Sequence, residues 1–413
     1  MSTAVLPPST ALSPPVAVAR LAGFGMLGLG VLLSGFVMSE PAPYELMMVG
    51  LVAVWFLSGL RISRSTGALL ALLMTFNVGG LLSLTVMTDL AGGPLYIAVS
   101  LFLALTSVFY AAIIEEYPGV LRLIFRAWVV SALLTGSLGI LGYFHAFPGS
   151  EVFTLYDRAK GAFQDPNVFG PFLVTPCLYL IHGLLTGKLH QAPLRIAGLL
   201  VLTLAVFLSF SRAAWVLFLF TVCGLVFVML LKERTGAFRL KIAALSLAAV
   251  VMMVGAMVVA LQSEKVSGLF SSRTQLVQEY DGGYLGRFDR HRLGFEMAME
   301  KPLGIGPMVF STMFPEDEHN IWLKSLTTYG WLGFLSYVAL MAWTISFGFR
   351  YLLRDRPWQP YLMIAWIVTV GHAVIGNVID TDHWRHFYLL LGLLWGCRAL
   401  EQRHFRKAGP TAR

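Results

Sequence analysis

Long apolar segments recur along almost the whole of this chain, and they constrain its fold more than any other feature. A helix of about 20 apolar residues crosses the roughly 30 Å of hydrocarbon in a bilayer. Charged residues make up 13% of the 413 residues, against about 25% in soluble domains. We therefore predict an all-α, polytopic membrane helix bundle with no soluble domain. About twelve transmembrane helices are expected, over residues 21–38, 43–60, 66–88, 94–114, 121–146, 168–186, 193–209, 213–231, 240–262, 320–348, 359–378 and 386–400.

Basic residues gather in alternate connections between the predicted helices. If the amino end is cytoplasmic, the connections on that side hold most of the 30 Lys and Arg and few of the 22 Asp and Glu. Cytoplasmic loops of membrane proteins carry such an excess. We predict an even number of spans with both termini in the cytoplasm. The net charge of +8 then follows from topology and requires no nucleic-acid partner, and membrane lipids are the expected surroundings.

The chain divides into a central membrane domain and two short tails. Residues 1–20 are rich in Pro, Ser and Thr, which predicts a disordered cytoplasmic tail. Residues 21–400 form the predicted membrane domain, in which 21–38 is a retained helix because no convincing cleavage site follows it. Residues 401–413 form a basic cytoplasmic tail. The longest connection, 263–319, mixes polar and apolar residues and predicts short helices on the outer side. The three cysteines lie in apolar runs and are expected to be membrane-buried, unpaired thiols.

Arginines on the predicted outer side require an explanation, because outer loops usually avoid them. Arg212 lies between two apolar runs, and Arg287 and Arg290 lie three positions apart in the long outer loop. On a helix, that spacing places two guanidinium groups on one face, where they suit phosphate oxygens. The alternative is that these arginines contact lipid headgroups or pair with a nearby acid.

The segment "QDPNVFG" has the pattern of a helix start. Asp165 is expected to be the N-cap, Pro166 the first helical residue, and Asn167 part of the first turn. Capping alone explains these residues. A helix start that faces a site would in addition attract an anion.

The segment "PEDEHNIWLKSLTTYGWLG" places three acids and a histidine directly before an apolar helix. His319, at the outer membrane surface, could take a proton from a hydroxyl near neutral pH. Glu316, Asp317 and Glu318 could orient the imidazole, or they could form a solvated loop that favours a helix start. Further along, Gly330 and Gly333 would allow neighbouring helices to approach closely.

The outer segment "DTDHWRH" offers Asp380, Asp382, His383 and His386 as possible ligands of a divalent metal. Two acids at this spacing often occur by chance, and short outer loops are commonly acidic. We expect no metal and no cofactor.

Together, these motifs resemble the O-antigen ligase and O-antigen polymerase family of bacterial inner membranes. The ligase pattern is His, then Asn, Ser or Gln, nine residues, and Gly-x-x-Gly. His319-Asn320, nine residues, and Gly330-Trp331-Leu332-Gly333 satisfy it at every position. The elements Asp165-Pro166-Asn167 and Ser211-Arg212, an arginine in the long loop at Arg287, and the segment 302–307 also match. The resemblance covers about 150–400, and the first 150 residues match only as a run of helices.

The resemblance implies a metal-independent, inverting glycosyltransferase. The donor would be a glycan on a polyprenyl (undecaprenyl) diphosphate, and the active site would face the periplasm. His319 would activate the acceptor hydroxyl or stabilise the leaving group. Arg287 would share in catalysis, and Arg212 and Arg287 would hold the diphosphate, with Arg290 expected beside them. Asp165, Asn167, Asn320, Gly330 and Gly333 would support the site.

Three functions stay open at this point. A ligase would move the glycan onto lipid A–core, and the glycine spacing favours this function. A polymerase would join lipid-linked repeat units onto a growing O-antigen or exopolysaccharide. A transporter or flippase for lipid-linked glycans is the alternative of another class. Few ionisable groups lie deep in the predicted spans, which argues against a transporter.

Overall fold

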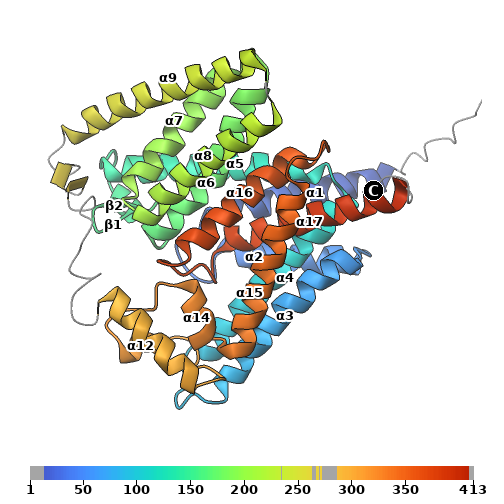
Figure 1. Cartoon of the computed structure of the whole chain (residues 1–413), viewed down its shortest axis with the longest axis vertical. Coiled ribbons are helices and arrows are strands. Elements are labelled where there is room, and N and C mark those ends of the chain that lie inside the picture. The colour runs from blue at the N-terminus through green and yellow to red at the C-terminus, as the bar shows by residue number, and fades with distance from the viewer. Residues whose placement is uncertain (1–13, 234, 263–266, 269, 272–285, 409–413) are drawn as a thin grey trace, which may run out of the picture.

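The computed structural model describes residues 14–233, 235–262, 267–268, 270–271 and 286–408, and these form a bundle of helices (Figure 1). In its first half, the elements are α1 (Pro14–Leu33), α2 (Pro43–Leu57), α3 (Arg64–Leu84), α4 (Gly93–Glu116), α5 (Val120–Tyr143), the 3-10 helix η1 (Ser150–Phe153), β1 (Thr154–Leu155), β2 (Arg158–Ala159), α6 (Pro166–Thr186) and the 3-10 helix η2 (Leu189–Gln191). The second half comprises α7 (Ala192–Leu208), α8 (Arg212–Lys232), α9 (Gly236–Leu261), α12 (Arg287–Glu300), α13 (Phe310–Met313), α14 (Ile321–Thr327), α15 (Gly330–Tyr351), α16 (Gln359–Ile375) and α17 (Arg385–Ala408).

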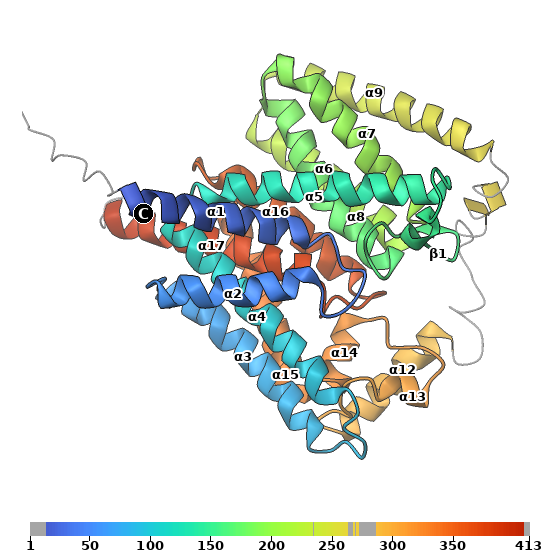
Figure 2. The same ribbon diagram turned by 180° about the vertical axis from the view of Figure 1, so that it is seen from behind.

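Helices that are distant in the sequence pack side by side. α17 packs along α4 and α15 along α3, while α6 contacts its sequence neighbours α7 and α8. The antiparallel hairpin of β1 and β2 follows α5 and pairs Thr154 with Ala159. The start of α1 and the end of α17 lie at one end of the molecule, whereas the hairpin, α12 and α13 lie at the other (Figure 2). The two ends of the bundle therefore differ, as expected for a membrane protein whose connections lie alternately on the two sides of the bilayer.

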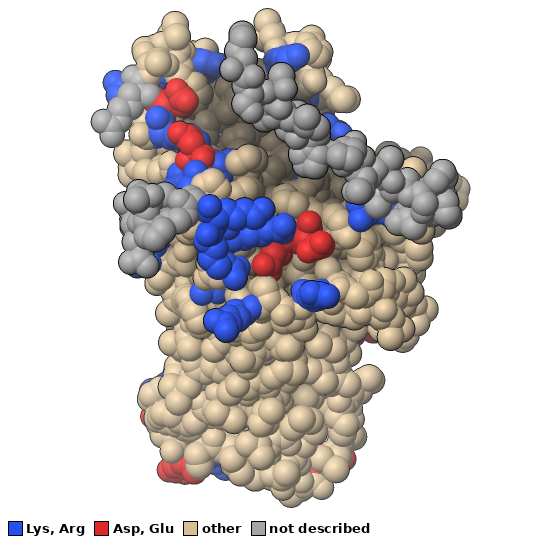
Figure 3. All heavy atoms as spheres, turned by 90° about the vertical axis from the view of Figure 1, so that its right-hand side faces the viewer, with Lys and Arg blue, Asp and Glu red and all other residues tan. Residues whose placement is uncertain are grey.

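Seven helices in the described part of the chain are long and apolar enough to cross a bilayer: α3, α4, α5, α6, α7 (here counted from Leu189 to Leu208), α8 and α15. Val18–Leu33, Pro43–Leu57 and Gln359–Ile375 are shorter apolar helices. The predicted multi-pass helical membrane protein is confirmed in this form, while the number twelve and the orientation stay predictions. Figure 3 shows Lys and Arg side chains in the middle and upper parts of one face of the molecule.

The predicted tails are shorter than expected. α1 begins at Pro14, inside the segment 1–20 that was predicted to be disordered, and residues 1–13 lie outside the described residues. α17 continues to Ala408, into the predicted tail 401–413. The loop 263–319 contains the short helices α12 and α13, as expected for its described part. Cys177 and Cys397 are buried, but Cys223 is exposed on the surface of the bundle.

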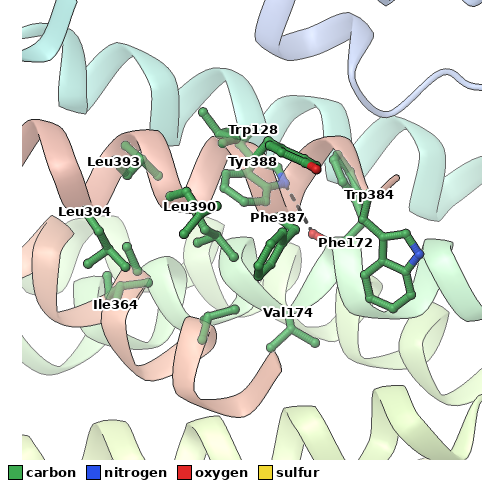
Figure 4. Packing of buried hydrophobic residues seen from close by; sticks show 14 of the residues in the cluster. Trp128, Phe172, Val174, Ile364, Trp384, Phe387, Tyr388, Leu390, Leu393 and Leu394 are labelled. Atoms are coloured by element: carbon green, nitrogen blue, oxygen red, sulfur yellow. Dashed lines mark hydrogen bonds between the residues drawn. The ribbon is translucent and has the colours of Figure 1, made fainter. Parts of the chain in front are cut away.

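The core where α5, α6, α16 and α17 meet shows how the bundle accommodates proline. Pro176 lies inside α6 and has no N–H to donate to the carbonyl of Phe172, four residues earlier. The Nε1 of Trp128, on α5, donates to that carbonyl at 3.2 Å (Figure 4). The indole therefore fills the position of the missing helical hydrogen bond, and α5 and α6 are joined in the apolar core.

The apolar run 320–348 is not one helix, which corrects the prediction. α14 ends at Thr327, and α15 begins at Gly330, whose φ is +66°. That conformation favours glycine and interrupts the helix. The carbonyl of Thr327 accepts a hydrogen bond from the N–H of Ile305 at 2.7 Å, and the N–H of Trp331 donates to the carbonyl of Pro302 at 2.9 Å. The loop 302–306 thus satisfies backbone groups at the break between α14 and α15.

Candidate active site

The histidine motif lies at the start of α14, which packs against α15 and α12 (Figure 2). Asn320 caps α14, because its Oδ1 accepts hydrogen bonds from the N–H groups of Trp322 at 3.0 Å and Leu323 at 3.2 Å. His319 precedes the cap with a φ of +48°, a conformation uncommon for a residue other than glycine. Backbone strain of this kind is often found at functional sites. The cap and the positive φ place the imidazole beside the acidic side chains described next.

The imidazole of His319 lies between two carboxylates from different segments. Its Nδ1 is 3.9 Å from Oδ2 of Asp380, and its Nε2 is 4.0 Å from Oε2 of Glu316. Once the imidazole carries a proton, each carboxylate would form an ion pair with it at these distances. The side chain of His319 is 38% exposed, so a substrate can reach it.

Asp380 connects the histidine to a buried lysine. Its Oδ1 accepts a hydrogen bond from the N–H of Asn320 at 2.8 Å. The Nζ of Lys324 lies 3.3 Å from Oδ2 of Asp380 and 2.9 Å from Oδ2 of Asp317. Burial disfavours the charged form of Lys324, but Asp380 and the neighbouring acids outweigh it and raise the lysine pKa well above its ordinary value. Lys324 is therefore a cation at neutral pH and compensates the acids around it.

Glu318 differs from the other acids because it is 1% exposed. Its Oε1 accepts a hydrogen bond from the hydroxyl of Thr327 at 2.5 Å, while its Oε2 has no hydrogen-bond partner among the described residues. Burial raises the pKa of Glu318 to about 8. A substantial fraction of this carboxyl is therefore protonated at neutral pH.

α12 holds the segment that leads to His319. The guanidinium of Arg290 donates from one terminal nitrogen to Oε2 of Glu316 at 2.8 Å, and from the other to the carbonyl of Asp317 at 3.0 Å. Nε2 of His291 lies 2.8 Å from the carbonyl of Glu318. The Arg290 side chain is 2% exposed, so a diphosphate could reach it only by displacing Glu316. Arg290 was predicted to bind diphosphate, but its contacts are those of a residue that positions this segment.

The other two predicted arginines each begin a helix. Arg287 is the first residue of α12 and Arg212 the first of α8, where the side chain of Ser211 caps the helix. Both are partly buried. Arg287 lies close enough to His291 to lower that imidazole's pKa, an effect that adds to the larger effect of burial. The structure therefore places Arg287 on the helix that supports the histidine segment, and Arg212 at the turn between α7 and α8.

The expected helix start at Asp165 is confirmed. Oδ1 of Asp165 accepts a hydrogen bond from the N–H of Asn167 at 2.6 Å, which caps α6. Oδ1 of Asn167 in turn accepts from Arg158 at 2.8 Å, and Nε of Arg158 donates to the carbonyl of Ser209 at 2.8 Å. Arg158 thus joins the start of α6 to the turn that leads into Arg212.

A polar cavity of about 270 Å³ brings the Asp165 and His319 segments together. We define it by six of its lining residues, which come from the loop after α1, the start of α6, α14, the segment before α17 and the first residue of α17: Glu40, Asp165, Lys324, Asp380, Asp382 and Arg385. The cavity shares Asp380 and Lys324 with the cluster around His319. Residues separated widely in the sequence therefore form one continuous polar site.

The two acids of the "DTD" segment bind different partners. Asp380 contacts the His319 segment, whereas Oδ2 of Asp382 accepts from the hydroxyls of Tyr96 at 2.5 Å and Tyr329 at 3.3 Å. In the described part of the chain, the carboxylates of Asp317, Glu318 and Asp380 lie close enough to hold a metal ion. The Lys324 ammonium already lies beside two of them and supplies positive charge. This donor set therefore suits a lysine better than a divalent ion.

Lys324, Tyr96 and Arg158 were not among the predicted site residues. A lone lysine inside an apolar run is a sequence signal that could have identified Lys324. Arg158 is visible as an outer arginine, but its pairing with Asn167 depends on how the hairpin folds. Tyr96 has no distinguishing pattern in a chain with 14 tyrosines.

The glycines of the motif have separate structural roles. Gly330 permits the break before α15 through its positive φ. A Cβ at Gly79 of α3 would lie 2.7 Å from the backbone N of Gly333, so the two helices approach closely at this point. The predicted close approach is confirmed for Gly333.

Residues 197–338 match the family model described as O-antigen ligase. This segment contains Arg212, Arg287 and His319, and also both glycines of the motif. No curated protein matches the chain. Over residues 197–338, this multi-pass membrane protein is therefore similar to the O-antigen ligase family.

Proposed function

We propose that this protein transfers a glycan from a polyprenyl diphosphate to an acceptor hydroxyl at the periplasmic face of the inner membrane, acting as an O-antigen ligase on lipid A–core. The observation that carries the proposal is the position of His319. Its imidazole is accessible and lies within 4.0 Å of two carboxylates, and His319 directly follows the segment that α12 holds through Arg290. A site with these features suits proton removal from a hydroxyl.

The tautomer of His319 follows from its neighbours. Glu316 is engaged by Arg290, so Asp380 is the better partner for a ring N–H, and Nδ1 would carry the proton that faces it. Nε2 then accepts the acceptor's hydroxyl proton. The hydroxyl oxygen attacks the anomeric carbon of the donor sugar, and the bond from that carbon to the diphosphate oxygen breaks. The attack and departure occur on opposite faces, so the configuration inverts.

The leaving group is a lipid diphosphate, whose negative charge increases as the bond breaks. We assign its stabilisation to Arg287 and Arg212, since guanidinium forks suit phosphate oxygens. Arg290 positions the histidine segment, and Asp165, Asn167 and Asn320 fix the helix starts around the site. In this mechanism, positive charge comes from arginine, so no metal is required. Undiminished transfer in the presence of a chelator would support this point, and loss that Mg²⁺ restores would contradict it.

Purified protein with the native lipid-linked donor tests the proposal. Product that requires lipid A–core indicates a ligase, and a ladder of longer glycans formed without lipid A–core indicates a polymerase. Arg287→Ala and Arg212→Ala should weaken donor use strongly, whereas Arg350→Ala, at the far end of α15, should not. Equal effects of all three would mean that the outer arginines only anchor the protein. No product under any condition would favour the alternative function, transport of lipid-linked glycans.

A further inference from the structure

The polar cavity lies next to the proposed catalytic histidine, and apart from Asp380, which orients that histidine, its lining has no role in the transfer steps above. Its wall includes Asp380, whose Oδ2 is 3.9 Å from Nδ1 of His319. His319, Arg212 and Arg287 do not line it in the described part of the chain. The cavity is therefore a compartment beside the reaction centre, with room for a further part of a substrate.

The charges in the cavity are unfavourable for a diphosphate. Its two cations are engaged by acids: Lys324 pairs with Asp317 and Asp380. Arg385 donates to Glu40 at 3.0 Å and to Glu45 at 2.5 Å. Acids outnumber cations among the lining residues, so the wall repels an anion.

The wall instead offers acceptors for hydroxyl groups. Carboxylate oxygens accept hydrogen bonds and cannot donate them when ionised. Lys324 and hydrogen bonds from tyrosine hydroxyls lower the pKa of Asp382, against the effect of burial, so this acid is ionised at neutral pH. Nε2 of His383 is buried and has no hydrogen-bond partner among the described residues, although His383 lines the cavity. A buried polar atom of this kind normally has a hydrogen-bond partner, which a bound substrate could supply.

Aromatic rings form a further part of the wall. Tyr96, Phe163 and Trp384 line the cavity, and the ring of Tyr96 lies 4.0 Å, centroid to centroid, from that of His383. Small-molecule sites commonly combine aromatic surface with a few fixed polar groups. A sugar ring has this character, because its hydroxyls surround apolar C–H faces.

We propose that the polar cavity binds a hydroxyl-rich sugar ring of one substrate and excludes the diphosphate. The proposal rests on the proposed function, because it adds a sugar subsite to that active site. A ring bound against Asp380 would bring a hydroxyl or an anomeric carbon close to His319. The ring could belong to the acceptor or to the first sugar of the donor, and kinetics can separate these two sources.

Asp165→Asn is the first variant, because asparagine caps helices as well as aspartate does and keeps the side-chain volume. Glu40→Gln and Trp384→Leu are second variants that change the wall without removing the α6 cap. Loss of a hydrogen bond to a charged group should raise one KM by about tenfold or more. A higher KM for lipid A–core assigns the ring to the acceptor, and a higher KM for the lipid-linked glycan assigns it to the donor. Inhibition by inorganic diphosphate should stay unchanged.

Arg287→Ala should show the reverse pattern, with weakened diphosphate inhibition. Glu151→Gln is the matched control, since Glu151 is an exposed acid on η1 outside the cavity lining. Unchanged KM values for both sugars in all three cavity variants would overturn the proposal, and so would weaker diphosphate inhibition in them.

A binding assay keeps this test separate from the transfer reaction. Free core oligosaccharide and free repeat-unit saccharide are titrated against purified wild-type protein and Asp165→Asn. If wild-type protein transfers no glycan but binds one saccharide at least about tenfold more tightly than the variant, the cavity proposal holds and the proposed function fails. If transfer proceeds and neither saccharide distinguishes the two proteins, the cavity proposal is wrong.

Discussion

Lys324 and Asp380 are 56 positions apart in the sequence, yet their side chains meet with Nζ and Oδ2 3.3 Å apart. Lys324 lies on α14 and Asp380 precedes α17, so the ion pair connects two segments of the candidate site. The same carboxylate lies 3.9 Å from the imidazole of His319. The lysine therefore sets the charge balance next to the residue proposed to move a proton.

Replacing Lys324 by Met should destabilise the protein. The change leaves Asp317 and Asp380 without their buried cation, and removing one partner of a buried ion pair costs about 3–5 kcal/mol. Thermal unfolding in detergent measures the effect. The double variant Lys324→Met, Asp380→Asn should recover part of the loss, because it removes one of the stranded charges. If Lys324→Met were as stable as the wild-type protein, the ion pair would contribute nothing to stability.

Glu318 should make stability depend on pH. Its pKa is raised by burial from an ordinary 4.5 to about 8 in the folded protein, so the folded state binds the proton more tightly than the unfolded chain. Wild-type stability should therefore decrease as the pH rises from about 4.5 to about 8. Glu318→Gln stays neutral and should lose this dependence, so it should exceed wild type in stability at pH 8 by more than at pH 5. Unfolding temperatures with parallel pH profiles would contradict this assignment.

Arg290 should act on the rate rather than on diphosphate binding. Its contacts with Glu316 and the Asp317 carbonyl hold the segment before His319. Arg290→Ala should lower kcat by about tenfold or more while inhibition by inorganic diphosphate stays unchanged. Arg292→Ala is the control on the same helix, because Arg292 is 64% exposed and pairs with Glu296 one turn further along that helix. If Arg290→Ala weakened diphosphate inhibition as strongly as Arg287→Ala, Arg290 would be a donor ligand, as its sequence spacing suggested.

Gly330→Ala should destabilise the break between α14 and α15. The φ of Gly330 is +66°, and a Cβ there would lie 2.8 Å from the carbonyl oxygen of Pro302. The left-handed conformation alone costs alanine roughly 1–2 kcal/mol, and the backbone clash adds to it. Gly50→Ala on α2 has open space around its Cβ and should be neutral or stabilising. Equal unfolding temperatures for the two variants would argue against a structural need for glycine at 330.

Local sequence patterns predicted the helices well. The apolar runs gave most helix positions to within a few residues, and the capping pattern identified the start of α6 at Asp165. The break at Gly330 was missed because the run 320–348 is apolar throughout, and hydrophobicity does not report a positive φ. The start of α1 was misplaced because the Pro, Ser and Thr residues of 1–15 are typical of a disordered tail, and the end of α17 because its last turns are polar and basic.

The site was predicted only in part, because its pairings are long-range. The segment around His319 was identified as a candidate site, but the pattern could not show that Asp380 lies beside it. It also could not show that Arg290 is engaged by Glu316, because spacing on a helix gives a face but not the neighbour that packs against it. Contacts of this kind depend on how α12, α14 and α17 pack together.

The most direct test of the account is the rate of glycan transfer by purified His319→Ala, with the native lipid-linked donor and lipid A–core. Thermal unfolding checks that the variant is folded like the wild-type protein, and inhibition by inorganic diphosphate checks that its arginine site is intact. The account predicts a rate lower by about 100-fold or more, as expected when a general base is removed, with both checks unchanged. A folded His319→Ala protein that transfers glycan at the wild-type rate would contradict the assignment of His319 as the base.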